Sequence, residues 1–140
     1  MRKLIAAAVM LAVLICVLMP SVSFTEDRDT VLLAKTIYAL GKNEDYTTKL
    51  ALGNVVTNRM DNPWFDSNLG DVLQDQQQFP AGSRYDRDSL KAAHEVLSGR
   101  QVISEYALYY QAADSMYLWS GENLVDSMGG YNFYSASGNL

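Results

Sequence analysis

From about position 30, apolar residues recur along the chain at intervals of three and four, which is typical of amphipathic helices. The first such helix is predicted by three positions: Leu33, Ile37 and Leu40. Asp29 or Thr30 can cap its start, because either side chain can accept a hydrogen bond from a free backbone N–H of the first turn. Gly41 is placed to cap its end.

Three further helical segments follow the first. Residues 46–60 form the longest one. Gly53 lies inside it at a cost of about 1 kcal/mol relative to alanine, which favours close packing of this helix against a neighbouring backbone. A short segment spans residues 68–73, and the last helix spans residues 88–98.

The character of the sequence changes after position 99. Two aromatic-rich runs, Ala107-Leu108-Tyr109-Tyr110 and Tyr131-Asn132-Phe133-Tyr134, are typical of strands, and Gly129-Gly130 precedes the second run as a turn. Helices first and short strands later predict an α+β domain with a small antiparallel sheet.

The first 23 residues have the organisation of a signal peptide. Two basic residues at 2–3 precede an unbroken apolar run at 4–19, and small residues at 21–23 offer a cleavage site. The alternative is a membrane anchor, but the apolar run is shorter than the ~20 residues that a membrane span needs. We therefore expect cleavage after Ser23, a mature domain at 24–140, and a secreted or cell wall protein.

Charge and cysteine content limit the function classes. The whole chain has 11 basic and 16 acidic residues, and cleavage would remove Arg2 and Lys3 alone among them, which leaves a net charge of −7. This charge argues against nucleic acid and anionic membranes as partners, so we expect membrane contact only through the leader. The single cysteine is Cys16, where lipoprotein processing is a weak alternative because bulky Ile15 precedes it. The mature domain then has no disulfide and no thiolate metal site, and we expect no cofactor.

Five short motifs from the first two predicted helices occur in a fixed order and spacing. They are Leu32-Leu33-Ala34, Ile37-Tyr38-Ala39, Leu40-Gly41-Lys42-Asn43-Glu44, Asp45-Tyr46 and Val55-Val56-Thr57-Asn58-Arg59. Further motifs follow in order: Gln78-Phe79, Ala107-Leu108-Tyr109-Tyr110, Trp119-Ser120 and Gly129-Gly130-Tyr131-Asn132-Phe133-Tyr134. Together they resemble the SleB-like cell wall hydrolases over about residues 31–134, and the first set aligns without a gap.

That resemblance implies a lysozyme-like α+β fold and cleavage of the glycan strand of peptidoglycan. Lytic transglycosylase chemistry is typical of the family, in which one glutamate acts first as acid and then as base. The family's catalytic glutamate aligns with Leu40, and a family histidine aligns with Tyr131. Leucine has no proton to give, and the loss of a positioned general acid costs about 10²–10⁴-fold in rate. The spacing of Leu40 with Leu33 and Ile37 instead predicts a core or groove-lining residue.

Glu44 is the candidate for a replacement acid, because it aligns with the second glutamate of the family motif. Glu44 is the fourth residue after Leu40, so a continued helix would put both on one face. Gly41 and Asn43 argue against that continuation, and we expect Glu44 in the following loop. The alternative is that Glu44 caps or salt-bridges the second helix. Other carboxylates, with no motif to support them, are Asp45, Glu105 and Glu122.

Further candidates could bind sugar through ring stacking and amide hydrogen bonds. The substrate-binding set is Gln78, Phe79, Tyr109, Tyr110 and Trp119. Tyr109 and Tyr110 are adjacent on a strand and therefore point to opposite faces, so at most one of them faces a groove. Arg59 is expected to pair with a carboxylate within the fold. His94 is the only histidine, so it cannot form a metal site with a second one, and a structural role is expected.

Two hypotheses from different classes remain open. In the first, the chain is a diverged peptidoglycan-cleaving enzyme of the glycosidase or lytic transglycosylase type. In the second, it is a non-catalytic relative that binds glycan strands or regulates an active hydrolase, with another cell wall protein as its partner. The Leu40→Glu variant probes the difference between the two. If this variant cleaves peptidoglycan, the groove is intact and only the acid was lost; if it does not, the groove itself has diverged.

Overall fold

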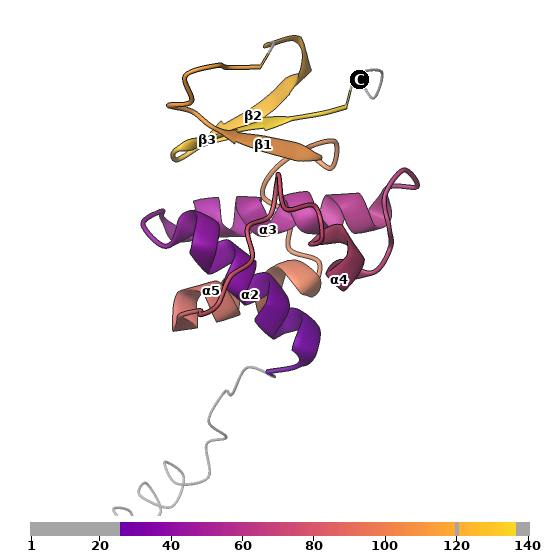
Figure 1. Ribbon diagram of the computed structural model, residues 1–140, viewed down its shortest axis with the longest axis vertical. Coiled ribbons are helices and arrows are strands. Elements are labelled where there is room, and N and C mark those ends of the chain that lie inside the picture. The colour runs from indigo at the N-terminus through magenta and orange to yellow at the C-terminus, as the bar shows by residue number, and fades with distance from the viewer. Residues whose placement is uncertain (1–25, 120, 137–140) are drawn as a thin grey trace, which may run out of the picture.

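The computed structural model describes residues 26–119 and 121–136, so the predicted leader and its cleavage site lie outside the described residues. The helices are α2 (Arg28–Gly41), α3 (Tyr46–Asp61), α4 (Leu69–Val72), α5 (Arg87–Leu97) and the 3₁₀ helix η1 (Gly121–Asn123), and the strands are β1 (Tyr109–Ala112), β2 (Leu124–Met128) and β3 (Tyr131–Tyr134). Figure 1 shows the sheet at one end of the domain and α2, α4 and α5 toward the other, with α3 running between them. Within the part described, no helix is long and apolar enough to cross a membrane.

An aspartate caps the start of each of the three long helices. Asp27 accepts a hydrogen bond from the N–H of Thr30 at 2.7 Å, and Asp45 and Asp86 cap α3 and α5 in the same way. Each cap satisfies a backbone donor that the helix itself leaves free. The predicted cap of the first helix, Asp29 or Thr30, is therefore wrong, because Asp27, two residues before Asp29, accepts from the free N–H of Thr30.

Two glycines let the helices approach one another closely. A Cβ on Gly53 would lie 3.1 Å from Val96 and 3.2 Å from Ile37, so α3 packs here against side chains of α5 and α2 rather than against a backbone. Gly41 is the last residue of α2 and not its cap, which is Lys42. A Cβ on Gly41 would lie 2.9 Å from a methyl carbon of Leu52. The absence of a side chain at Gly41 thus serves packing rather than the turn.

The sheet has three antiparallel strands in the order β1-β3-β2. Tyr109 pairs with Tyr134 and Tyr110 pairs with Phe133. The first strand begins two residues later than the aromatic run predicts, although the N–H of Leu108 still donates to Tyr134. Strand β2 was not predicted, because its half-exposed residues carry little of the strand pattern. The predicted fold class, α+β with a small antiparallel sheet after the helices, is confirmed.

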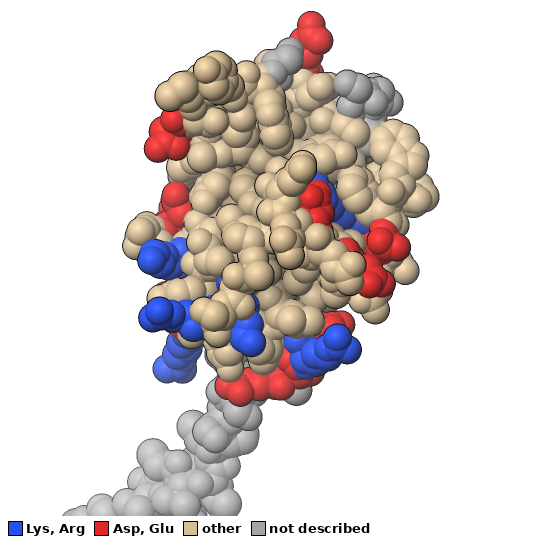
Figure 2. Space-filling model, viewed as in Figure 1, with Lys and Arg blue, Asp and Glu red and all other residues tan. Residues whose placement is uncertain are grey.

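The charged side chains are unevenly distributed between the helices and the sheet. Residues 101–140 contain no lysine or arginine. Figure 2 accordingly shows the basic side chains gathered over the helical part and only acidic ones around the sheet. The sheet end of the domain therefore carries a negative field.

Candidate functional site

The position of the expected acid lies at the junction between α2 and β3. Leu40 occupies the last turn of α2 and packs, partly buried, against the core. Tyr131 is the first residue of β3, and its hydroxyl donates a 2.6 Å hydrogen bond to the carbonyl oxygen of Leu40. Leu40 and Tyr131, which stand where a glutamate and a histidine of the family are expected, are therefore joined directly to each other.

Glu44 lies in the loop between α2 and α3, as predicted, because α2 ends at Gly41. The N–H of Gly130 donates to both carboxylate oxygens of Glu44, at 3.2 and 3.3 Å. A Cβ on Gly129 would lie 2.5 Å from Glu44, and the positive φ of Gly129, 55°, also favours glycine. The carboxylate of Glu44 therefore holds the turn between β2 and β3 against the loop between α2 and α3.

Burial raises the pKa of the Tyr131 hydroxyl, and the nearby negative charge of Glu44 raises this pKa further. A phenol with a raised pKa keeps its proton at neutral pH. Tyr131 is therefore a stable hydrogen-bond donor to the end of α2.

Gln78 joins the loop before α5 to strand β1 by hydrogen bonds with Tyr110. Its amide oxygen accepts from the N–H of Tyr110 at 3.1 Å, and its amide nitrogen donates to the carbonyl of Tyr110 at 3.4 Å. The hydroxyl of Tyr110 donates in turn to the backbone carbonyl of Gln78. Phe79 is 1% exposed and packs against the ring of Tyr110. Gln78, Phe79 and Tyr110 therefore use their side chains within the fold in this conformation.

Arg59 is the largest buried side chain described in this domain. Its Nε donates to the carbonyl of Leu108 at 2.7 Å and its Nη1 pairs with Asp75 at 3.0 Å, which confirms the predicted carboxylate partner. Three rings surround the guanidinium, with centroids 4.7–4.9 Å from its central carbon: Phe65, Phe79 and Tyr109. Arg59 thereby joins α3 to β1 and to the loops on either side of α4.

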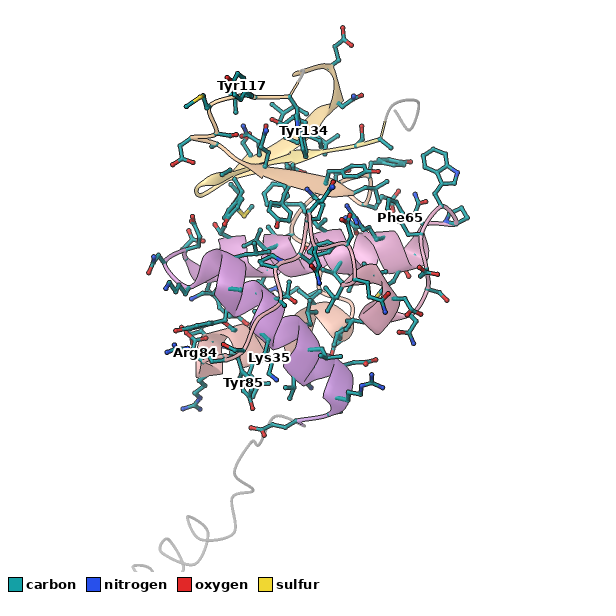
Figure 3. The ribbon with its side chains drawn as sticks, viewed as in Figure 1. Lys35, Phe65, Arg84, Tyr85, Tyr117 and Tyr134 are labelled. Atoms are coloured by element: carbon teal, nitrogen blue, oxygen red, sulfur yellow. The ribbon has the colours of Figure 1, made fainter. Side chains whose placement is uncertain are left out.

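An aromatic pocket of about 240 Å³ lies on the sheet, and its described lining is Tyr109, Trp119, Asn123, Tyr134 and Ser135. Trp119 meets Tyr134 edge to face at 5.1 Å and Tyr109 at 6.4 Å. Figure 3 shows Tyr134 on the sheet and Phe65 at the junction of the sheet with α3. The structure thus brings Tyr109 and Trp119 together from the predicted set. It also adds three residues that the sequence reasoning missed, although Tyr134 lies in a motif that it had noted.

Tyr109 and Tyr110 point to opposite faces of the sheet, as their adjacency predicts. Tyr110 is 8% exposed and faces the core, whereas Tyr109 lines the aromatic pocket. Asp45 and His94 do not line the aromatic pocket, whereas Glu122 lies in η1 beside the lining residue Asn123. Asp45 caps α3, and His94 lines a surface pocket with the first turn of α2. Over the described ranges, no group of three or more histidine, cysteine, aspartate or glutamate side chains is arranged to hold a metal ion.

Comparison with known proteins identifies the family. A family model described as Cell Wall Hydrolase matches residues 43–134, a range that begins just after Leu40. A curated spore cortex-lytic enzyme of Halalkalibacterium halodurans is 28% identical over 102 residues, which cover 67% of this chain and 31% of the relative. This chain therefore matches about a third of the length of that relative.

Two solved structures share the fold. The catalytic domain of the Bacillus cereus SleB protein aligns with a TM-score of 0.69 and 19% identity, covering 82% of this chain and 94% of that one. The catalytic domain of the germination-specific lytic transglycosylase SleB from Bacillus anthracis aligns with a TM-score of 0.68 and 19% identity, covering 83% and 100%. The predicted lysozyme-like architecture is confirmed by this likeness. The chain belongs to the SleB-like cell wall hydrolase family.

Proposed function

We propose that this protein is an exported domain that binds the glycan strands of peptidoglycan and cleaves them far more slowly than a relative with an intact acid. One observation carries the proposal: Leu40 stands at the expected acid position on an otherwise retained fold. Its side chain packs against the core, and its carbonyl oxygen is bonded to Tyr131. A general acid must carry a proton within hydrogen-bond reach of the leaving oxygen, and leucine cannot.

The arrangement of Glu44 supports the same conclusion. Its oxygens are directed at the N–H of Gly130, so the carboxylate holds a turn in place. To act as a general acid, Glu44 would have to leave this turn and move toward a sugar. Loss of an acid without replacement lowers the rate by about 10²–10⁴-fold.

The experiment measures muropeptide release from purified peptidoglycan by the protein expressed from its full-length sequence. The Leu40→Glu variant is the test and Leu40→Gln is its control, because glutamine has a similar shape but no acidic proton. We expect release from Leu40→Glu only. Co-sedimentation with insoluble peptidoglycan tests binding, and we expect all three proteins to pellet. Wild-type release as fast as that of Leu40→Glu would refute the loss of activity.

A second candidate function is cleavage with Glu44 as the acid. It is favoured by the position of Glu44, whose charge acts on the hydroxyl of Tyr131 beside the end of α2. Under this alternative the wild type releases muropeptides and Glu44→Gln does not, while Leu40→Gln leaves the rate unchanged. Under the first proposal, none of these three proteins releases muropeptides at a measurable rate.

A further inference from the structure

We propose that an exposed apolar surface at the sheet end of the domain docks a partner protein, whose own groove is apolar and bordered by lysine or arginine side chains. Five apolar residues form this surface, the tip patch: Met116, Tyr117, Leu118, Trp119 and Leu124. Their side chains are 41–87% exposed. Apolar side chains that gather on a surface mark interaction sites, whereas single exposed ones are normal. Docking at the tip patch goes beyond the proposed glycan binding and does not depend on it.

The tip patch is continuous along the chain and across the sheet. Residues 116–119 follow one another in the loop after β1. The ring of Trp119 meets that of Tyr134 at 5.1 Å, and Leu124 on β2 is paired with Tyr134 on β3. Because paired residues on neighbouring strands share a face, Leu124 and Trp119 both flank Tyr134. Figure 3 shows Tyr117 at the outer end of the domain, beyond the sheet and far from α2. The patch is therefore one surface rather than a set of scattered side chains.

The loop that carries the patch is held by Gln111 of β1. The amide oxygen of Gln111 accepts from the N–H of Trp119 at 3.0 Å, and its amide nitrogen donates to the carbonyl of Tyr117 at 2.7 Å. On this fixed backbone the side chains of Met116 and Tyr117 are 87% and 81% exposed. A surface whose backbone is already held loses less entropy when a partner binds.

The kinds of side chain in the tip patch favour a protein partner over a sugar. Methionine, tyrosine and tryptophan are enriched in the cores of protein–protein interfaces. Met116 and Leu118 offer a sugar neither a flat ring for stacking nor a hydrogen-bond donor. The flexible thioether of methionine instead adapts to irregular apolar contacts. An apolar groove of another protein would bury these two side chains together with the rings of Tyr117 and Trp119.

The charge around the tip patch selects a basic partner. Asp114 lies two residues before Met116, Glu122 lies two residues before Leu124, and both acidic residues are exposed. Residues 101–140 contain four acidic residues and no lysine or arginine. Figure 2 shows acidic but no basic side chains at this end, on the face drawn. Charge complementarity steers association and rejects partners of like charge. Basic side chains around the partner's groove would therefore meet these carboxylates.

The same acidic border argues against two other occupants. Anionic lipid headgroups attract basic segments, so an anionic membrane would be repelled from this end of the domain. A two-fold pair of this chain would place the same surface of both copies in contact. The two acidic borders would then face each other, which is unfavourable. A basic partner protein is the occupant that fits both the apolar side chains and the charge.

The test uses a fluorescein-labelled amphipathic helical peptide of leucine and lysine as the probe. Its fluorescence anisotropy is measured with the protein expressed from its full-length sequence. One control peptide has glutamate in place of every lysine, and another has the same composition in an order that leaves no apolar face. We expect only the first peptide to bind. Tyr117→Ser should raise its Kd by at least about tenfold, because the ring no longer becomes buried. Asp114→Lys should raise it about three- to tenfold at low salt and less at high salt.

Trp64→Ser is the matched control, because Trp64 is 62% exposed but lies in the loop between α3 and α4, outside the tip patch. Its Kd should equal that of the wild type. An unchanged Kd in Tyr117→Ser, or equal binding of the glutamate peptide, would overturn the inference. Loss of pelleting with peptidoglycan in Tyr117→Ser would also overturn it, by making the patch a glycan surface. A dimer that Tyr117→Ser dissociates, or binding of the wild type to phosphatidylglycerol vesicles that Tyr117→Ser abolishes, would overturn it as well.

Discussion

Replacing Arg59 by methionine should destabilise the domain severely, although Arg59 lies outside any proposed chemistry. The side chain is 1% exposed and connects α3 to the sheet through the carbonyl of Leu108. Methionine has a similar length and is apolar, so it fills much of the same space without donors. The substitution therefore isolates what the guanidinium contributes.

The magnitude follows from three contributions. The Leu108 carbonyl loses its donor inside the protein, which costs about 1–3 kcal/mol. Loss of the three ring contacts adds about 0.5–1 kcal/mol for each ring that no longer stacks. The pair with Asp75 contributes at most about 1 kcal/mol, because Asp75 is 42% exposed. The substitution also removes the buried Nη2, which has no hydrogen-bond partner among the described residues, and this gain offsets part of the loss. We expect a decrease of about 2–4 kcal/mol in the free energy of unfolding.

The assay is urea unfolding followed by circular dichroism, with the midpoint compared at constant slope. Asp75→Asn removes only the exposed ion pair and should lower the free energy of unfolding by about 1 kcal/mol or less. Arg59→Lys keeps the charge but loses Nε and the planar stack, so it should resemble Arg59→Met. Two results would contradict this reasoning: equal decreases in the free energy of unfolding for Asp75→Asn and Arg59→Met, or an Arg59→Lys variant as stable as the wild type. Either would show that the charge pair, rather than the three aromatic rings around the guanidinium, joins α3 to the sheet.

Three further outcomes can be measured in the same way. Glu44→Gln should lower the free energy of unfolding by about 1 kcal/mol, because the N–H of Gly130 loses a charged acceptor. An unchanged urea midpoint would show that Glu44 does not stabilise this turn. Tyr131→Phe should cost about 0.5–1.5 kcal/mol by freeing the carbonyl at the end of α2, and hydrogen exchange there should accelerate. Burial raises the pKa of Tyr46, Tyr110 and Tyr131 in the folded state. The unfolded chain therefore loses these protons first, and stability should fall as the pH rises above about 10, whereas a flat profile would refute this coupling.

The helices could be predicted from the sequence because their signals are local. Apolar spacing located α2, α3 and α5 to within about two residues, and only their caps and ends needed correction. The first cap was missed because Asp27 lies two residues before the nearest predicted candidate. Strand β2 was missed because its register depends on β3, which lies further along the chain.

The contacts at the candidate site could not be predicted, because they join residues far apart in sequence. The position of Leu40 and the loop position of Glu44 follow from spacing and from Gly41. The partner of Glu44, Gly130, lies 86 residues away, and no local pattern indicates it.

The links between sheet and helices also set the order in which the domain can form. Leu40 and Tyr131 are 91 residues apart, and Arg59 and Leu108 are 49 apart. Such long chain closures are slow and cost entropy before any contact repays it, whereas α2 and α3 are joined by only the residues 42–45 and can pack early. We expect α2 and α3 to pair first and the sheet to dock onto α3 afterwards. The sheet, together with the aromatic pocket on it, is then the last part of the domain to become structured.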